Sequence, residues 1–303
     1  MRYQGAASTN SLLLTAISSA AVAQGWTQSE RYTEPTFSYD VLVLTIDSSF
    51  YWYIGCSSSQ FYLKLSTSYT ASVGWNSVPN QPPSNGNSVC EGVAGSLISH
   101  NIFAFADCVH VSCEISAGKF RHFSFGKIEK IGSYTGGEYV VGMNFANITA
   151  DFENSNHAVL WDSLTGSPGN NGIIRLSGAY GATTYSKFCE TTASYGVAAG
   201  NARRGFGSYT MRLNGPNTFN NRARYCPVLI FMSDSDTVNP TYWYPVGYVP
   251  YVRLVNNELL TEKEADPDNP SWISFPMIKK SASLGSANPP GDSYNNGIAY
   301  DGS

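Results

Sequence analysis

The sequence predicts a mainly β protein, built from antiparallel, β-sandwich-like sheets with one short N-terminal α-helix. Its 303 residues include 20 tyrosines, 15 phenylalanines and 28 glycines, a composition that favours pleated strands joined by tight turns. Short apolar or alternating runs recur along the chain and are separated by polar, glycine-containing turns. With 42% hydrophobic and 13% charged residues, the chain can bury a substantial core.

The first expected element is a helix over residues 11–23, SLLLTAISSAAVA. The segment also resembles a secretory signal peptide with an Ala-Val-Ala cleavage site, but threonine and serines interrupt its apolar run. As a retained helix it begins at a Thr9 or Asn10 cap, ends at Gly25, and docks one face on a sheet. That face holds Leu13, Ala16, Ile17 and Ala20. No run reaches the roughly 20 apolar residues that a membrane span requires, so we expect none.

Several strands are expected after the helix. The run 39–46 is apolar on both sides, which is typical of a buried strand, and two further strands follow it across short turns to form a meander. A loop rich in proline, asparagine and glycine covers residues 78–88, and a strand pair comes after it. The other four expected strands are 51–56, 61–66, 100–106 and 109–115.

The stretch 119–145 predicts a hairpin with aromatic walls. Its first half alternates as a strand does, and its second half resumes a strand at 138–141. Thr135, Gly136 and Gly137 are the expected glycine-rich turn. The stretch has no spacing typical of a nucleophile, a metal site or a phosphate loop, so it indicates a structural role.

Within this hairpin, His122 has two interpretations. Alternation places Arg121 and Phe123 on one face of the strand and His122 and Ser124 on the other. The Arg121-His122 pair is a candidate proton switch or polar anchor. We favour a histidine that hydrogen-bonds a backbone carbonyl inside the sheet. Gly126, like the two turn glycines, is expected to adopt a backbone conformation that a side chain would block.

The chain organisation follows from two polar segments. We expect a helix and lead-in at 1–30, a first β-rich region at 31–161, and a second at 162–303. The polar run 162–172 marks either a domain boundary or a long insertion within one domain. The second region holds four expected strands at 173–176, 208–213, 228–232 and 248–255.

The six cysteines are too widely spaced for a dense disulfide framework, so most are expected to be reduced core residues. Cys108 and Cys113, with His110 and His122 nearby, are an alternative zinc-binding set. Their Cys-x4-Cys spacing is at the loose end for ligands and no second pair completes it, so buried thiols are the preferred interpretation. We expect no metal and no cofactor.

Charge and motifs favour a protein without catalytic activity. The net charge is −4 and no basic run occurs, so nucleic acid is not an expected partner. Common hydrolase, metalloprotease and nucleotide-binding motifs do not occur in the sequence. Asp234 and Asp236 are a candidate glycosidase pair, but turn capping is preferred. Asp266, Asp268 and Asn269 are a candidate calcium loop, but a solvated turn is preferred.

Candidate interface residues come from two segments. The densest aromatic run can fill an interface, line the ordinary core, or stack on sugars. Prolines at every fifth position favour a packed, extended wall over a sugar platform. The run consists of Tyr242, Trp243, Tyr244, Tyr248 and Tyr251. Arg203 and Arg204 are a local positive charge that suits either an acidic neighbour or a solvated loop.

Several passages together resemble a family of tailed-bacteriophage virion structural proteins found among tail, neck and baseplate components. They are the leucine-rich opening helix that runs into Gly-Trp-Thr at 25–27, FAFADCVHVSCEIS at 103–116, FRHFSFGKIEKIGSYTGGEY at 120–139, WISFPMIKK at 272–280 and GIAY at 297–300. The residues in matching places are Arg121, His122, Phe125, Gly126, Lys130, Thr135, Gly136 and Gly137. The two cysteines at 108 and 113 and the segment 217–224 depart from the family pattern.

The resemblance implies a structural subunit that contacts other phage virion proteins, in a homo-oligomeric ring or another symmetric assembly. Its expected location is the virion, assembled in the bacterial host cytoplasm. The alternative is a receptor-binding or carbohydrate-binding tail protein, or a sugar-cleaving one, with Trp243, Asp234 and Asp236 as the residues concerned.

Overall fold

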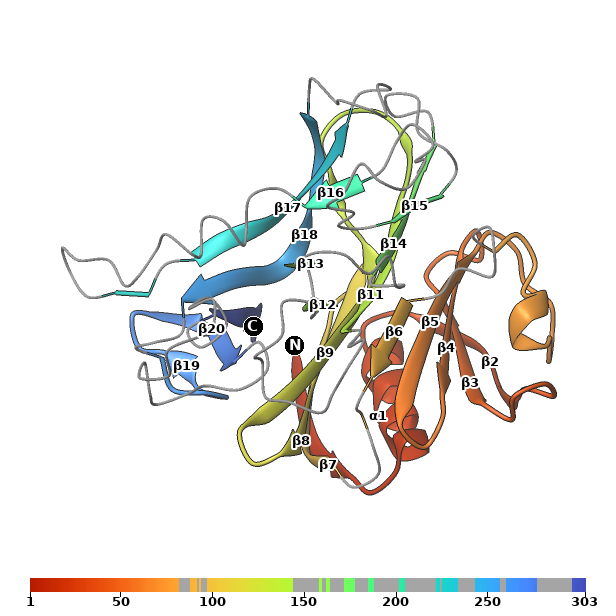
Figure 1. Ribbon diagram of the computed structural model, residues 1–303, viewed down its shortest axis with the longest axis horizontal. Coiled ribbons are helices and arrows are strands. Elements are labelled where there is room, and N and C mark those ends of the chain that lie inside the picture. Colours follow the sequence, from red (N-terminus) through yellow and green to blue (C-terminus); the bar gives the residue numbers. More distant parts are fainter. Residues whose placement is uncertain are drawn as a thin grey trace.

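The computed structural model confirms a mainly β fold with a short N-terminal helix (Figure 1). It describes residues 1–81, 88–91, 93, 97–143, 158–159, 162–163, 172–177, 185–187, 202–204, 222–223, 225–233, 243–256, 260–276 and 296–303. Three larger antiparallel sheets lie side by side in it, and we call them the first, central and third sheets. A two-stranded ribbon, β12 (Ala158–Val159) with β13 (Asp162–Ser163), is separate from them.

The first sheet, at the right of Figure 1, is a meander. Its strands follow chain order: β2 (Thr27–Thr33), β3 (Asp40–Thr45), β4 (Tyr51–Cys56), β5 (Gln60–Ser66) and β6 (Ser88–Glu91). This confirms the expected meander. Leu42 and Leu44 alternate with Val41 and Val43, and all four are fully buried, because both faces of β3 are covered.

The central sheet has the strand order β1-β7-β8-β9-β11-β14-β15. Its strands are β1 (Arg2–Ala7), β7 (Leu97–Ala104), β8 (Cys108–Ser116), β9 (Lys119–Lys127), β11 (Thr135–Gly142), β14 (Gly172–Ser177) and β15 (Tyr185–Lys187). β14 pairs with β11, so this sheet contains strands from both expected β-rich regions.

The third sheet, at the left of Figure 1, has the order β16-β17-β18-β21-β20-β19. Its strands are β16 (Ala202–Arg204), β17 (Tyr225–Ser233), β18 (Trp243–Asn256), β19 (Ala265–Asp266), β20 (Asn269–Pro276) and β21 (Asn296–Asp301). The short strand β10 (Glu129–Lys130) also pairs with β18. The expected strand at 208–213 lies outside the described residues.

The helix α1 (Asn10–Val22) forms as expected and contacts both the first and the central sheet. Thr9 is its N-cap, and its hydroxyl accepts a hydrogen bond from the Leu12 backbone N–H at 3.2 Å. The buried face includes Leu13, Ile17 and Ala20, as predicted. Gly25 follows the helix with φ of +91°, the left-handed conformation that glycine adopts readily. Within the described part of the chain, we find no helix whose length and hydrophobicity suit a membrane crossing.

The hairpin of β9 and β11 is confirmed, but the predicted position of its turn is wrong. Thr135, Gly136 and Gly137 begin β11, and the connection comes before them, where β10 leaves to join the third sheet. Gly136 and Gly137 have φ of +118° and +103°, and the pairing of β11 with β14 shifts register between Gly136 and Tyr139. The glycines therefore serve a strand irregularity and not a turn.

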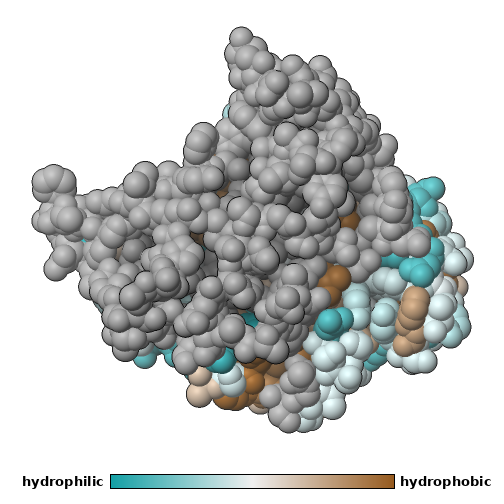
Figure 2. Space-filling model, in the orientation of Figure 1, coloured by the Kyte–Doolittle hydropathy of each residue, from teal (hydrophilic) through white to brown (hydrophobic). Residues whose placement is uncertain are grey.

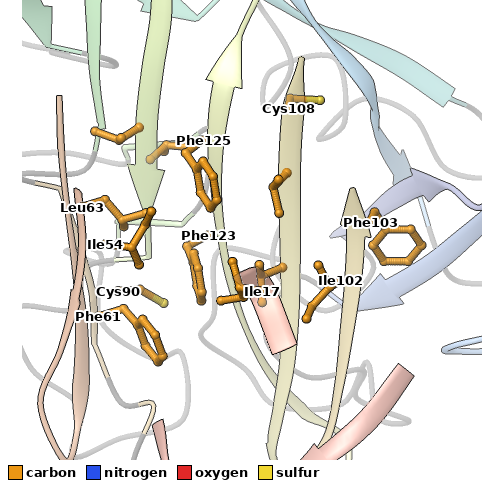
Figure 3. Packing of buried hydrophobic residues seen from close by; sticks show 14 of the residues in the cluster. Ile17, Ile54, Phe61, Leu63, Cys90, Ile102, Phe103, Cys108, Phe123 and Phe125 are labelled. Atoms are coloured by element: carbon orange, nitrogen blue, oxygen red, sulfur yellow. The ribbon is translucent and has the colours of Figure 1, made fainter. Parts of the chain in front are cut away.

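The central sheet is buried on both faces. Phe123 of β9 and Phe61 of β5 stack with ring centroids 4.9 Å apart, which joins the central sheet to the first. Figure 3 shows Phe123 and Phe125 directed toward Phe61, Ile54 and Leu63, and Phe103 directed to the other side of β7. On that side Phe103 stacks on Tyr300 of the third sheet at 4.8 Å. One continuous core therefore crosses all three layers.

Candidate interaction surface and sheet seam

The outer face of the first sheet carries a second cluster of aromatic residues, which we call the outer-face cluster. Along β5, Phe61, Leu63 and Leu65 face the core, and Tyr62, which lies between two of them, faces this cluster. The buried members are Val41, Val43, Tyr53, Trp75 and Val78, and the half-buried members are Tyr32, Tyr39, Tyr51, Tyr62, Tyr69 and Val73.

Lys64 holds the loop that covers this cluster. It lies in β5 and is fully buried. Its Nζ donates to the backbone carbonyl of Trp75 at 2.7 Å and to Oε1 of Gln81 at 2.6 Å, and it lies 4.9 Å from the Trp75 ring centroid. Burial lowers the pKa of Lys64 to about 8, and the charge of Glu34 opposes this shift. The amine therefore acts as a structural donor.

Glu34 fixes the neighbouring loop and is also fully buried. Its carboxylate accepts backbone N–H groups of Thr36 and Trp75, both at 3.0 Å, and of Phe37. Burial raises the pKa of Glu34, but these backbone hydrogen bonds together outweigh it and hold the pKa below its ordinary value. The loop that carries Phe37 is thus fixed before any partner binds.

Phe37 is exposed at the end of a stack of three rings. Its side chain stacks on Tyr39 with centroids 5.3 Å apart, and Tyr39 stacks on Tyr62 at 4.6 Å. The residue is 46% exposed, although its ring is stacked and its backbone is hydrogen-bonded to Glu34. On the face seen in Figure 2, the first-sheet side is mostly hydrophilic or intermediate in colour, with small separate brown areas. We call Phe37, Tyr39 and Tyr62 the aromatic stack.

The seam between the central and third sheets contains two fully buried histidines. His110 of β8 is hydrogen-bonded through Nε2 to the Pro250 carbonyl at 3.0 Å and through Nδ1 to the Ser124 hydroxyl at 2.6 Å. His122 of β9 is bonded through Nε2 to the Pro276 carbonyl at 3.0 Å and through Nδ1 to the Tyr300 hydroxyl at 3.0 Å. The predicted carbonyl partner of His122 exists, but it belongs to another sheet.

Both histidines are held neutral in this seam. Burial lowers the pKa of His110 to about 3, against a smaller opposing effect of the Pro250 carbonyl. Burial likewise lowers the pKa of His122 to about 4, where the Pro276 carbonyl opposes the shift and the Arg121 charge adds to it. Arg121 itself lies on the other face of β9, as the alternation predicts, and is 5% exposed.

The aromatic run predicted as an interface lies largely in β18. Tyr248 is half-buried, and Tyr251 is 37% exposed and stacks on Phe105 with centroids 3.8 Å apart. The backbones of Trp243 and Tyr244 pair with β17, while Tyr242 lies outside the described residues, as do Asp234 and Asp236. Arg203 and Arg204 lie in β16 opposite Phe231 and Ile230. The run is therefore spread along one strand.

The described residues do not form the alternative metal sites. Cys108 lies on the same face of β8 as His110, and strand alternation places Cys113 on the opposite face. Asp266 accepts the Tyr225 hydroxyl at 2.5 Å and the Asp268 backbone N–H at 2.9 Å, as in a capped turn. In the described part of the chain, no three His, Cys, Asp or Glu side chains gather at one point.

Sequence inspection did not identify Lys64, Glu34 or Phe37. The available signals were a lysine inside an otherwise apolar strand and a glutamate beside the Pro-Thr-Phe turn. Neither signal indicates a partner until the fold places the 75–81 segment over the sheet.

No family model matches the sequence, and no curated protein sequence matches it.

Proposed function

We propose that this chain is a non-catalytic structural subunit of a tailed-phage virion, which works through protein–protein contacts in a tail, neck or baseplate assembly. The passages that resemble the virion family include β8, β9, the start of β11 and β21, and together these strands form much of the interior of the fold. The proposal gives those residues a structural role.

The observation that carries the contact function is the aromatic stack. The Phe37 ring is stacked on Tyr39 and its backbone is held by the buried Glu34 carboxylate, so it loses little conformational freedom when a partner covers it, and its burial favours association. The two buried charged residues near the stack, Lys64 and Glu34, both form hydrogen bonds with the Trp75 backbone. This arrangement suits recognition by shape.

The test is the mass of the purified chain in solution, measured by light scattering, alone and with virion particles that lack it. A defined oligomer, or a monomer that joins such particles, supports the proposal. Phe37→Ala should weaken that association. Ile131→Ala is the matched control and should not weaken it, because Ile131 is similarly exposed, at 44%, but lies in the β9–β11 connection and not in the aromatic stack. A monomer that never joins particles would contradict the proposal.

A second candidate function is carbohydrate binding on the same stack, because an exposed aromatic face also stacks on sugar rings. Titration of the chain with host-envelope glycans, followed by tyrosine and tryptophan fluorescence, separates the two. Saturable binding that Phe37→Ala removes and Ile131→Ala retains, in a chain that ignores particles, would favour this candidate.

A further inference from the structure

The seam between the central and third sheets contains two imidazoles whose ring nitrogens are all hydrogen-bonded in the neutral form. A backbone carbonyl accepts and never donates, so Nε2 of His110 and of His122 must each carry the proton given to Pro250 or Pro276. Nδ1 of each ring is then the acceptor for a hydroxyl, from Ser124 or Tyr300.

The hydroxyl network around His110 is arranged to donate to a neutral ring. The Tyr139 hydroxyl lies 2.9 Å from Ser124 Oγ, which lies 2.6 Å from His110 Nδ1. In the neutral state Tyr139 donates to Ser124, and Ser124 donates to the ring. If Nδ1 gains a proton, Ser124 must accept from the ring, so the hydroxyl pair has to reverse its donor order or the Ser124 hydrogen loses its acceptor.

The surroundings offer no compensating negative charge. His110 faces Cys108 at 3.4 Å, Ser124 and the rings of Phe105 and Tyr300, and Tyr139 reaches it through the Ser124 hydroxyl. His122 faces the rings of Phe120, Phe275 and Tyr300. Across the residues the structure describes, neither histidine has a carboxylate among these hydrogen-bond and ring partners.

Charged groups near the seam lie at its margins. Arg121 adjoins His122 in sequence and disfavours its protonation. Asp107 and the Met1 amino group act electrostatically on Cys108, with opposite signs. At the other end, Lys263 Nζ pairs with Glu114 at 3.0 Å and Arg2 donates to the Lys263 carbonyl at 3.1 Å. These pairs bridge the same two sheets but do not touch the imidazoles.

The third-sheet partner of His110 lies where β18 is irregular. Tyr248 pairs with Leu229 of β17 and Val252 pairs with Tyr300 of β21, and the regular ladder is interrupted between them. Pro250 lies in that interval, and the next residue, Tyr251, has a left-handed φ of +56°. The Pro250 carbonyl therefore finds its partner in the central sheet and not in the β17–β18 ladder.

We propose that His110 and His122 form a proton-sensitive latch, which keeps the third sheet docked on the central sheet while both rings are neutral and releases it in acid. The first sheet remains attached, because the contacts that join it to the central sheet, such as the Phe61–Phe123 ring stack and the hydrogen bond from Trp52 Nε1 to the Tyr139 carbonyl at 3.2 Å, do not involve an imidazole. This inference does not depend on the virion assignment.

The test is hydrogen–deuterium exchange of the full chain at about pH 7 and about pH 5, corrected for the intrinsic pH dependence of exchange. With folded pKa values of about 3 and about 4 and an ordinary value of 6.5, protonation should favour the released form ~20-fold for each histidine over this interval. Peptides from β18, β20 and β21 should exchange at least ~10-fold faster at the lower pH, while peptides from β3 to β5 should change little.

The variant pair His110→Gln with His122→Gln should remove this difference, because glutamine can donate to a carbonyl and does not titrate. The matched control is His100→Gln, in β7, whose ring lies against Gly5 of β1 and not in the seam. It should keep the full acid response. Equal acid responses in the double variant and the wild type would overturn the proposal, as would simultaneous opening of all three sheets.

A measurement on the wild type covers the case in which the double variant does not fold. NMR titration of the histidine ring carbons should show two histidines that remain neutral in the docked state down to about pH 5. If either seam histidine titrates near its ordinary value while the third sheet stays protected, the latch does not exist.

Discussion

Replacement of Gly126 by alanine should be among the most damaging single changes in the central sheet. Gly126 lies in β9 opposite Cys108 of β8, with φ of +147°. A Cβ there would lie 2.4 Å from the Asp107 carbonyl oxygen and 2.4 Å from the Cys108 Cα. Both are backbone atoms, one at the start of β8 and one just before it, and the Asp107 carbonyl accepts the Lys127 N–H at 2.8 Å, so neither can move aside without disturbing the pairing of β8 with β9.

The expected cost has two parts. Holding a non-glycine residue in this sparsely populated conformation costs about 1–3 kcal/mol. Forcing extra volume into a packed interior adds about 1–3 kcal/mol. Gly126→Ala should therefore lower the free energy of unfolding by about 2–6 kcal/mol, a large part of the total stability of a typical domain.

Gly132→Ala is the matched control, because Gly132 lies in the connection of the same hairpin with φ of +92°, and a Cβ added to it would meet nothing within 4 Å. It should cost only the conformational part, about 1–3 kcal/mol. Urea unfolding followed by circular dichroism measures both variants. If the two alanine variants lose the same free energy, close approach of the strands is not what requires glycine at this position.

Three further predictions concern other parts of the core. Phe123→Ala should lower the free energy of unfolding by about 3–5 kcal/mol, because it removes a ring stacked between two sheets; a loss below about 1 kcal/mol in urea unfolding would contradict this. Glu34→Gln should cost about 1–3 kcal/mol at neutral pH. The folded pKa of Glu34 lies below its ordinary value of 4.5, so its contribution to stability is present above that value and is lost as the pH falls through the folded pKa. The free energy of unfolding of the variant, measured from about pH 5 to about pH 3, should therefore fall less steeply than that of the wild type. Burial raises the pKa of the Cys108 and Cys113 thiols well above the ordinary value. A thiol reagent should therefore leave both unmodified in the native protein and label both after unfolding, as mapped by mass spectrometry. Rapid labelling of the native protein would contradict their burial.

The strands that the sequence predicted best are those with clear apolar patterns. The run 51–56 coincides with β4, and the runs for β3, β5, β7 and β8 differ only at their ends. β1 and β2 were missed because their sequences, RYQGAA and TQSERYT, lack a continuous apolar face. Long-range pairing stabilises β1, whose partner β7 begins about ninety residues later in the chain.

The functional features were harder to predict, because they depend on contacts between sheets. Strand alternation around His122 indicated a carbonyl partner, but not that Pro276 and Tyr300 of the third sheet supply both hydrogen bonds. The aromatic run at 242–251 drew attention by its density, whereas the exposed stack around Phe37 combines residues from a loop and from β5. A high local density of aromatic residues in the sequence does not reveal a surface cluster whose rings are distant from one another in the chain.

The strand order of the third sheet sets a sequence of events during synthesis. β21 lies between β18 and β20 and pairs with both, so strands made earlier cannot complete this sheet until residues 296–301 have emerged from the ribosome. β2 to β5 pair in the order in which they are made and need no such wait. β18 and β20 therefore spend the intervening time with unpaired edges, which makes chaperone binding or aggregation at these strands the main competitor of correct folding.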